Sequence, residues 1–251
     1  MKFVGIIPAR YASTRFPGKP LADILGKPMI QHVYERASQV LESVVVATDD
    51  QRIFDVVESF GGRVVMTSER HKTGTDRCYE AFTKLSEPYD VVINIQGDEP
   101  YIAMEQIKIL KSCFNSADVQ LATLVKTFDK NATFAELQNP NTPKVVINQQ
   151  QEAIYFSRSV VPYLRGVKPD QWLLNQTFYK HIGIYAYRAD ILAQITKMDQ
   201  TPLEKAESLE QLRWIEHGLH IKVAITEADN VSIDTPEDLA LLVEQLTPKN
   251  L

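Results

Sequence analysis

Short apolar runs alternate with amphipathic helical patterns through the first half of this 251-residue chain. The helical patterns cover residues 28–40, 50–60, 74–85 and 103–114, and the apolar runs are FVGIIP, VVVATD, RVVMT and VVINIQ. Continuous Val/Ile runs are typical of strands buried on both faces, and a helix between successive strands favours a parallel sheet. The pattern therefore predicts an α/β fold with a doubly wound, mostly parallel, Rossmann-like sheet joined by right-handed crossovers.

This alternation breaks down between residues 126 and 180, where NPNTPKVV, a strand pair around QEAIYFSR and the proline-containing VVPYLRGVKPDQW follow one another. We expect an inserted β-containing lobe within a single 1–251 domain. Its aromatic side chains suit either a dimer interface or packing within the lobe. These aromatics are Tyr155, Phe156, Tyr163 and Trp172. From His181 the α/β pattern resumes, with helices expected over 188–197 and 203–217, a strand at IKVAI and a final helix from Thr235.

The composition excludes several classes of protein. A formal net charge of -5 argues against a nucleic-acid partner, which requires a broad basic face. No run approaches the roughly 20 apolar residues that span a bilayer, and the amino terminus lacks a charged-then-apolar signal, so we expect no membrane partner and a cytoplasmic protein. Cys78 and Cys113 belong to no Cys/His cluster and are expected to be free thiols.

The loop after the first apolar run is rich in cations. Residues 6–21 read IIPARYASTRFPGKPL, with three cations (Arg10, Arg15, Lys19) and no acidic residue before Asp23. Arg offers a planar fork for phosphate oxygens and Lys a compact charge, while Gly18 lets the backbone turn sharply. The loop therefore predicts a polyphosphate site, although a solvated surface remains an alternative.

Two aspartates follow strand-like runs. Asp98 comes just after VVINIQ, and Asp234 follows a short apolar segment in VSIDTPEDL. Thr235, Pro236 and Asp238 are explained as the N-cap, N1 and N3 residues of a helix, which leaves Asp234 without a structural role. For either aspartate considered alone, a structural role in a turn explains the residue as well as a role as a ligand does. Together with the cationic loop they suit Mg²⁺ on a nucleotide, because Mg²⁺ takes one or two protein carboxylates and bridges phosphate oxygens.

The segment HKTGTDR at 71–77 allows two interpretations. Thr73 or Thr75 could be the N-cap of the following helix. Small hydroxyls and exposed backbone groups beside Arg77 could also hold a base or a ribose, and the two roles are compatible. Asp49 and Asp50 in ATDD are assigned no chemistry.

The collinear motifs IIPARYASTRFPGKPL, TGTDR, NIQGDEP, YFSRS, HIGIYAYR, LEQLRW and IDTPEDL closely resemble the 3-deoxy-manno-octulosonate cytidylyltransferase family across nearly the whole chain. The resemblance implies a nucleotidyltransferase fold, and the inserted lobe favours a dimer. It also implies Mg²⁺-dependent transfer of CMP from CTP to the eight-carbon acidic sugar Kdo, releasing pyrophosphate, for lipopolysaccharide biosynthesis. Lys19, Asp98 and Asp234 would be catalytic, and both aspartates would hold the metal.

The resemblance also implies two binding sets. The nucleotide would be bound by Ala9, Arg10, Ser13, Arg15, Lys19, Thr75, Arg77 and Gln96. The sugar would be bound by Gln96, Arg158, His181, Tyr185, Glu210 and Gln211. Several of these have structural alternatives: Arg158 as an ion-pair partner, His181 as a core-edge histidine, and the 210–211 pair as part of an amphipathic helix.

Three other functions are alternatives for this sequence. A cytidylyltransferase for a related acidic sugar, such as 8-amino-Kdo or a sialic-type acid, would need only one or two changes in the pocket. A dinucleotide oxidoreductase is disfavoured because no Gly-x-Gly-x-x-Gly follows the first strand. A silent nucleotide sensor is disfavoured by the retention of both aspartates with the cationic loop.

Overall fold

The structure is a computed structural model that describes residues 1–229 and 231–247. The chain forms two compact units, here called the first unit (Met1–Lys108 and Asp229–Leu251) and the second unit (Ile109–Ala228). Helix α4 (Met104–Cys113) carries the chain from one to the other. The segment 126–180, expected to be an inserted lobe, belongs to the second unit, and its status as a separate lobe stays a prediction.

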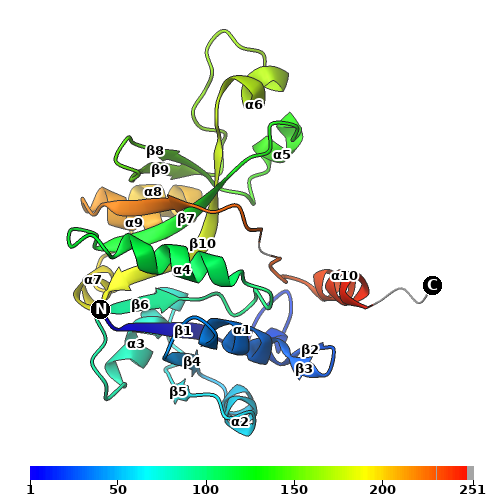
Figure 1. Cartoon of the computed structure of the whole chain (residues 1–251), viewed down its shortest axis with the longest axis vertical. Coiled ribbons are helices and arrows are strands. Elements are labelled where there is room, and N and C mark those ends of the chain that lie inside the picture. The colour runs from blue at the N-terminus through cyan, green and yellow to red at the C-terminus, as the bar shows by residue number, and fades with distance from the viewer. Residues whose placement is uncertain (230, 248–251) are drawn as a thin grey trace. The chain divides into compact units, whose positions relative to one another are not determined.

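The first unit is built on four parallel strands in the order β6-β1-β4-β5. Helices α1, α2 and α3 flank this sheet, and the small hairpin β2–β3 precedes α1 (Figure 1). The strands are β1 (Phe3–Ala9), β4 (Val44–Thr48), β5 (Val64–Met66) and β6 (Val91–Asn94), with β2 (Asp23–Ile24) and β3 (Lys27–Pro28) in the hairpin. The helices are α1 (Met29–Ser38), α2 (Gln51–Ser59), α3 (Gly74–Thr83) and α10 (Pro236–Leu246). Every residue of β4 and β6 is buried, as their continuous apolar runs predict.

The second unit has a mixed sheet. Strand β7 pairs in parallel with β11 and antiparallel with β10, which in turn pairs with the β8–β9 hairpin. The strands are β7 (Leu121–Thr127), β8 (Lys144–Ile147), β9 (Ala153–Ser157), β10 (Tyr179–Arg188) and β11 (Ile221–Ile225). The helices are α5 (Phe134–Gln138), α6 (Trp172–Asn175), α7 (Ala189–Ile195), α8 (Pro202–Glu207) and α9 (Gln211–Glu216). The expected α/β fold with a mostly parallel sheet and β structure in 126–180 is confirmed.

The single helix expected over 203–217 is wrong, because the chain breaks at Ser208. This residue adopts a left-handed conformation (φ 51°) between α8 and α9. Just before the break, the Glu207 carboxylate makes a tertiary contact: it accepts hydrogen bonds from Ser157 Oγ (2.6 Å) and Arg158 N (2.9 Å) at the end of β9. A tertiary contact therefore outweighs the helical periodicity, which continues through the break.

The aromatics of the segment 126–180 separate into two groups. Phe156 is fully buried, and Trp172 is 4% exposed in a core with Leu173 and Phe178. Tyr163 is 76% exposed, although its ring edge meets Trp172 with centroids 5.2 Å apart. Packing within the second unit therefore accounts for Phe156, whose ring meets His181, and for Trp172, and these two rings are not exposed.

Candidate active site

The cationic loop begins where β1 ends and closes on one main-chain oxygen. Tyr11 O accepts hydrogen bonds from Ser13 N (3.0 Å) and Gly18 N (2.9 Å). Gly18 has φ +71°, and a Cβ at this position would lie 3.0 Å from Tyr11 Cε2, so both conformation and space favour glycine. A 3₁₀ turn then starts at Lys19 and directs the chain into the β2–β3 hairpin.

Lys19 joins the two aspartates that sequence patterns singled out. Its Nζ donates to Asp98 Oδ2 at 2.7 Å and to the carbonyl of Ile233 at 2.8 Å, and it lies 3.6 Å from Asp234 Oδ1. Arg15 Nη2 donates to the same Asp234 oxygen at 3.0 Å. A main-chain bond from Ile233 N to Asp98 O (2.9 Å) fastens the two segments together. Carboxylates 136 positions apart in sequence therefore meet on one ammonium.

Two local structures position these aspartates. Asp98 follows β6, where the main chain turns at Gly97. Asp234 precedes α10, whose N-cap Thr235 forms the expected capping box with Asp238, and Pro236 occupies the first turn. The Asp238 carboxylate also accepts from Asp234 N (2.9 Å), and the hydrogen bonds from the Asp234 and Thr235 main chain lower the pKa of Asp238. The helix start therefore holds the Asp234 backbone in place.

A cavity of about 290 Å³ lies over this arrangement, within the first unit. Most residues expected to bind the nucleotide line it, namely Ala9, Arg10, Ser13, Arg15, Lys19, Arg77 and Gln96, and so do the two expected metal ligands, Asp98 and Asp234. Thr75 is buried instead and is not among the lining residues that the structure describes. His71 and Lys72 also line the cavity. They were not assigned as site residues, although they open the HKTGTDR segment that the sequence marks.

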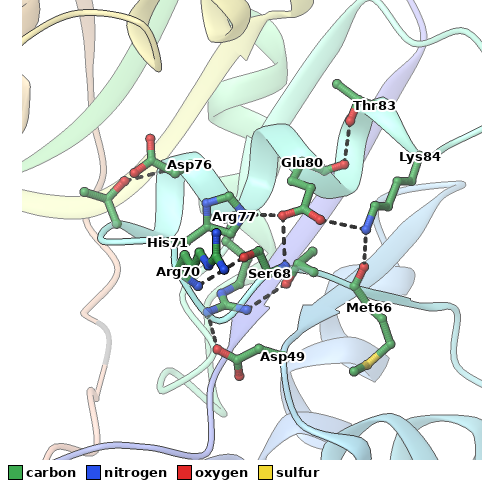
Figure 2. A network of polar contacts seen from close by, with 12 residues as sticks. Asp49, Met66, Ser68, Arg70, His71, Asp76, Arg77, Glu80, Thr83 and Lys84 are labelled. Carbon is green, nitrogen blue, oxygen red and sulfur yellow. Dashed lines mark hydrogen bonds and ion pairs between the residues drawn. The ribbon is translucent and has the colours of Figure 1, made fainter.

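Arg77 faces the cavity from a fixed position. Its guanidinium donates to Asp49 Oδ2 (2.6 Å) and to Thr67 Oγ1 (2.7 Å), and the residue is 4% exposed (Figure 2). Thr73, one of the two expected N-cap candidates, caps α3 by accepting from Asp76 N (3.1 Å), whereas Thr75 lies inside the helix. Asp49, to which no chemistry was assigned, is therefore a positioning partner of Arg77.

One turn further along helix α3, Glu80 is the centre of a second network (Figure 2). The Glu80 carboxylate contacts His71 Nε2 and accepts from Ser68 N (2.9 Å) and Lys84 Nζ (2.7 Å). Burial alone raises the pKa of Glu80, but the bonds from Lys84, Ser68 and His71 outweigh it and lower the pKa to about 2. Glu80 thereby holds the cavity-lining His71.

All residues expected to bind only the sugar belong to the second unit. Arg158 directs its guanidinium donors to main-chain oxygens, with Nε to Glu207 O (2.7 Å) and Nη1 to Pro140 O (2.9 Å). His181 Nε2 lies 3.0 Å from Thr123 Oγ1, and burial lowers the pKa of His181 from 6.5 to about 3. The imidazole is therefore neutral near pH 7.

Tyr185, Gln211 and Trp214 carry buried polar atoms in the second unit and are here called the polar cluster. The rings of Tyr185 and Trp214 meet edge to face with centroids 5.1 Å apart, and Gln211 lies on the same helix as Trp214. Within residues 1–229 and 231–247, Tyr185 Oη, Gln211 Nε2 and Trp214 Nε1 are buried without a hydrogen-bond partner. Burial, Tyr187 and the neighbouring Glu210 raise the pKa of Tyr185 well above 10. The sequence did not single out Trp214 as a candidate site residue, because its position in the amphipathic helical pattern is that of an ordinary core residue.

The two aspartates are the candidate metal ligands. No group of three or more His, Cys, Asp or Glu side chains suited to a metal occurs among the described residues. Two carboxylates that converge on one cation nevertheless fit Mg²⁺, which commonly takes one or two protein carboxylates and completes its shell with water and phosphate oxygens.

In the described part of the chain, no helix has the length and apolar composition needed to cross a membrane.

The parallel sheet, the cationic loop after its first strand and the paired carboxylates define a nucleotidyltransferase fold. A solved structure described as CMP:2-keto-3-deoxy-manno-octonic acid synthetase complexed with CTP matches with a TM-score of 0.89 and 43% identity, covering 98% of both chains. The chain belongs to the cytidylyltransferase family, whose sequence pattern matches residues 4–222.

Two curated relatives carry the name 3-deoxy-manno-octulosonate cytidylyltransferase. The protein from Parabacteroides distasonis is 63% identical over 240 residues, covering 95% of this chain and 96% of the relative. The protein from Phocaeicola vulgatus is 58% identical over 240 residues, covering 96% and 95%.

Proposed function

We propose that this protein transfers CMP from CTP to the anomeric hydroxyl of 3-deoxy-manno-octulosonate (Kdo), releasing pyrophosphate and supplying CMP-Kdo for lipopolysaccharide biosynthesis. The observation that carries the proposal is the meeting of Lys19, Asp98 and Asp234 in a cavity lined by Arg10, Ser13 and Arg15. Cations and carboxylates gathered in this way match a nucleoside triphosphate with a divalent ion. The names of the relatives point to the same substrates.

We further propose that Asp98 and Asp234 hold Mg²⁺. When bound, Mg²⁺ would neutralise phosphate oxygens and favour the attack of the sugar hydroxyl. The chain's own contribution is positional: the short contacts of Lys19 to Asp98 and Ile233 O place both carboxylates before any ligand arrives.

The reaction forms one P–O bond and breaks another. The anomeric oxygen of Kdo bonds to the α-phosphorus, the bond from that phosphorus to the bridging oxygen breaks, and the hydroxyl proton passes to water. Negative charge gathers on the α-oxygens and the leaving pyrophosphate. Lys19 is placed to stabilise the α-phosphate, while Arg10, Arg15 and the Ser13 hydroxyl bind the outer phosphates.

The polar cluster of the second unit supports a role in sugar binding. Buried donors without partners cost free energy, and a hydroxyl-rich ligand would satisfy them. Tyr185 Oη and Gln211 Nε2 are such groups. We propose that the sugar is bound by Gln96, Arg158, His181, Tyr185, Glu210 and Gln211. We propose Thr75 and Arg77 as part of the nucleotide site.

Pyrophosphate release tests the proposal. The assay is run with each of four nucleoside triphosphates against Kdo, 8-amino-Kdo and a sialic acid, with and without Mg²⁺. We expect rapid release only with CTP, Kdo and Mg²⁺ together. Faster turnover with another sugar would reassign the acceptor, and no release under any combination would refute the enzyme.

We also propose a homodimer that works in the cytoplasm, where a nucleoside triphosphate substrate is available. Exposed apolar side chains of the second unit, among them Ile154, Tyr163 and Leu174, support self-association. Sedimentation equilibrium at micromolar concentration should give twice the 28.5 kDa chain mass. A mass of one chain would contradict the dimer.

A further inference from the structure

Tyr11 is the point on which the cationic loop closes. Its carbonyl oxygen accepts from Ser13 N and Gly18 N, so both ends of the segment that carries Arg15 are fixed to one atom. Its ring lies against Gly18, where an added Cβ would come within 3.0 Å of Cε2 and 3.1 Å of Cζ. The next residue is Lys19, so the loop's fold determines where that ammonium lies.

The ring of Tyr11 is covered by a cation from another element. The guanidinium carbon of Arg52, in the first turn of α2, lies 3.3 Å from the ring centroid. The guanidinium is itself held, because Nε and Nη2 donate to the two oxygens of Asp50 at 2.9 and 2.7 Å. Asp50 also caps α2 by accepting from Arg52 N (2.9 Å). The stack is therefore anchored on a helix N-terminus.

Arg52 and Tyr11 stand apart from the cavity itself. Neither lines it among the residues that the structure describes, whereas Arg10, Ser13, Arg15 and Lys19 do. Arg52 is largely exposed, with a side-chain exposure of 59%. A solvent-facing arginine that pairs with its own N-cap would have no effect on nucleotide binding unless it acted through Tyr11.

We propose that Arg52 and Tyr11 are positioning residues for the triphosphate: their cation–π stack holds the Arg10–Lys19 loop in its closed conformation. The proposal rests on the nucleotide function proposed above. When a binding-competent conformation is only partly populated, apparent affinity falls by that fraction. The stack raises the closed population and so pre-organises the phosphate-binding donors.

Removing the cation tests the proposal. Arg52→Ala should raise the Kd for CTP and the KM about 2- to 5-fold, the range expected from one exposed cation–π contact. The kcat should stay within about twofold, because saturating CTP closes the loop by itself. Arg52→Lys, which keeps a cation without the planar fork, should fall between. The matched control is Arg63→Ala, which removes an exposed arginine paired with Glu87 in the same unit and should leave the Kd unchanged.

Two further measurements separate this role from a general loss of stability. Trypsin cleavage at Arg15–Phe16, followed without nucleotide, should accelerate in Arg52→Ala and not in Arg63→Ala. In a double-mutant cycle, Arg52→Ala should have less than a twofold effect on the Kd once Tyr11→Leu has removed the ring.

The proposal is overturned if the two substitutions are additive, or if affinity and cleavage both match the parent protein. The trypsin measurement needs no nucleotide. Failure of the parent protein to bind CTP would therefore refute the nucleotide function while leaving the loop tested.

Discussion

Lys19 is the residue on which the proposed chemistry depends most. With a side chain only 16% exposed, it bridges two carboxylates and a carbonyl. An ammonium in that position neutralises charge that would otherwise push Asp98 and Asp234 apart. The same geometry leaves both carboxylates partly exposed, at 25% and 41% for their side chains, so an additional cation can reach them.

Asp98→Asn and Asp234→Asn test the proposed catalytic role. Each should lower kcat by roughly a hundredfold to a thousandfold, because each removes a preorganised charge partner. Kinetics with saturating Mg²⁺ and circular dichroism check the loss and the fold. Turnover within tenfold of the parent enzyme would contradict the assignment.

Arg77 lines the cavity and also forms a buried ion pair with Asp49, so its removal should lower the stability of the protein. Arg77→Ala leaves Asp49 unpaired at a site where both side chains are less than 20% exposed. A loss of about 3–5 kcal/mol in the free energy of unfolding is expected, measured by urea denaturation.

The control for Arg77 is Lys27→Ala. It breaks an exposed pair with Glu35 and should cost at most about 1 kcal/mol. Equal losses in the two variants would show that Arg77 has no special structural role.

Helix starts are the elements that position the site. Thr73 caps α3 beside the cavity, Asp50 caps α2 beneath the Arg52–Tyr11 stack, and Thr235 caps α10 next to Asp234. A cap fixes the direction in which the chain enters the helix, so the residue just before it is held as well. These three N-caps therefore fix the backbone next to the site, so local sequence preferences help to determine the site geometry.

Thr235→Ala should weaken both the fold and the site. Loss of the capping box costs about 1 kcal/mol, and it loosens the backbone of Asp234. Thr133→Ala is the matched control, because it removes an equivalent capping box from α5 in the second unit. Both variants should lose similar stability in urea, but only Thr235→Ala should raise the KM for CTP with Mg²⁺. Equal KM values in Thr235→Ala and Thr133→Ala would show that the Thr235 cap has no effect on the site.

The Glu80 network ties α3 to the segment before it and predicts a pH dependence. The pKa of Glu80 is about 2 in the folded protein and 4.5 in the unfolded chain, so its stabilisation is complete above pH 4.5 and is lost as the pH falls toward 2. Glu80→Gln should therefore cost about 1–2 kcal/mol at pH 7 and progressively less toward pH 2. Denaturation curves at several pH values measure this difference, and a constant difference would contradict it.

At the scale of the whole molecule, the two units contribute different chemistry. The first contains the complete cation and carboxylate set, including Asp234 from the end of the chain. The second contains donors of Tyr185 and Gln211 that have no hydrogen-bond partner among the described residues. Because the nucleotide cavity is complete within one unit, nucleotide binding is expected without the sugar.

Thermal unfolding provides the corresponding measurement. CTP with Mg²⁺ at about 100 times its Kd should stabilise the protein by about 2.7 kcal/mol, seen as a rise in Tm. EDTA should remove most of this rise for the parent protein. Asp98→Asn should show little response to Mg²⁺ from the start. An equal rise with and without EDTA would contradict a metal held by the aspartates.

Periodicity and motif chemistry determine most of this fold. Buried Val/Ile runs, the N-caps Thr73 and Thr235, and the cationic loop all depend on neighbouring residues, so they can be read from the chain directly. The same local signals identify Asp234 as the residue that its helix start leaves unexplained.

Only the tertiary structure decides which distant groups meet. The contacts of Lys19 with Asp98 and Asp234, of Arg77 with Asp49, and of Arg52 with Tyr11 join separate segments, and no local spacing encodes them. Ser208 shows the same limit, since a contact of Glu207 with β9 ends a helix whose periodicity continues. The physical reason is that local preferences amount to a few tenths to one kcal/mol per residue, whereas breaking a buried contact between segments costs about 2–5 kcal/mol.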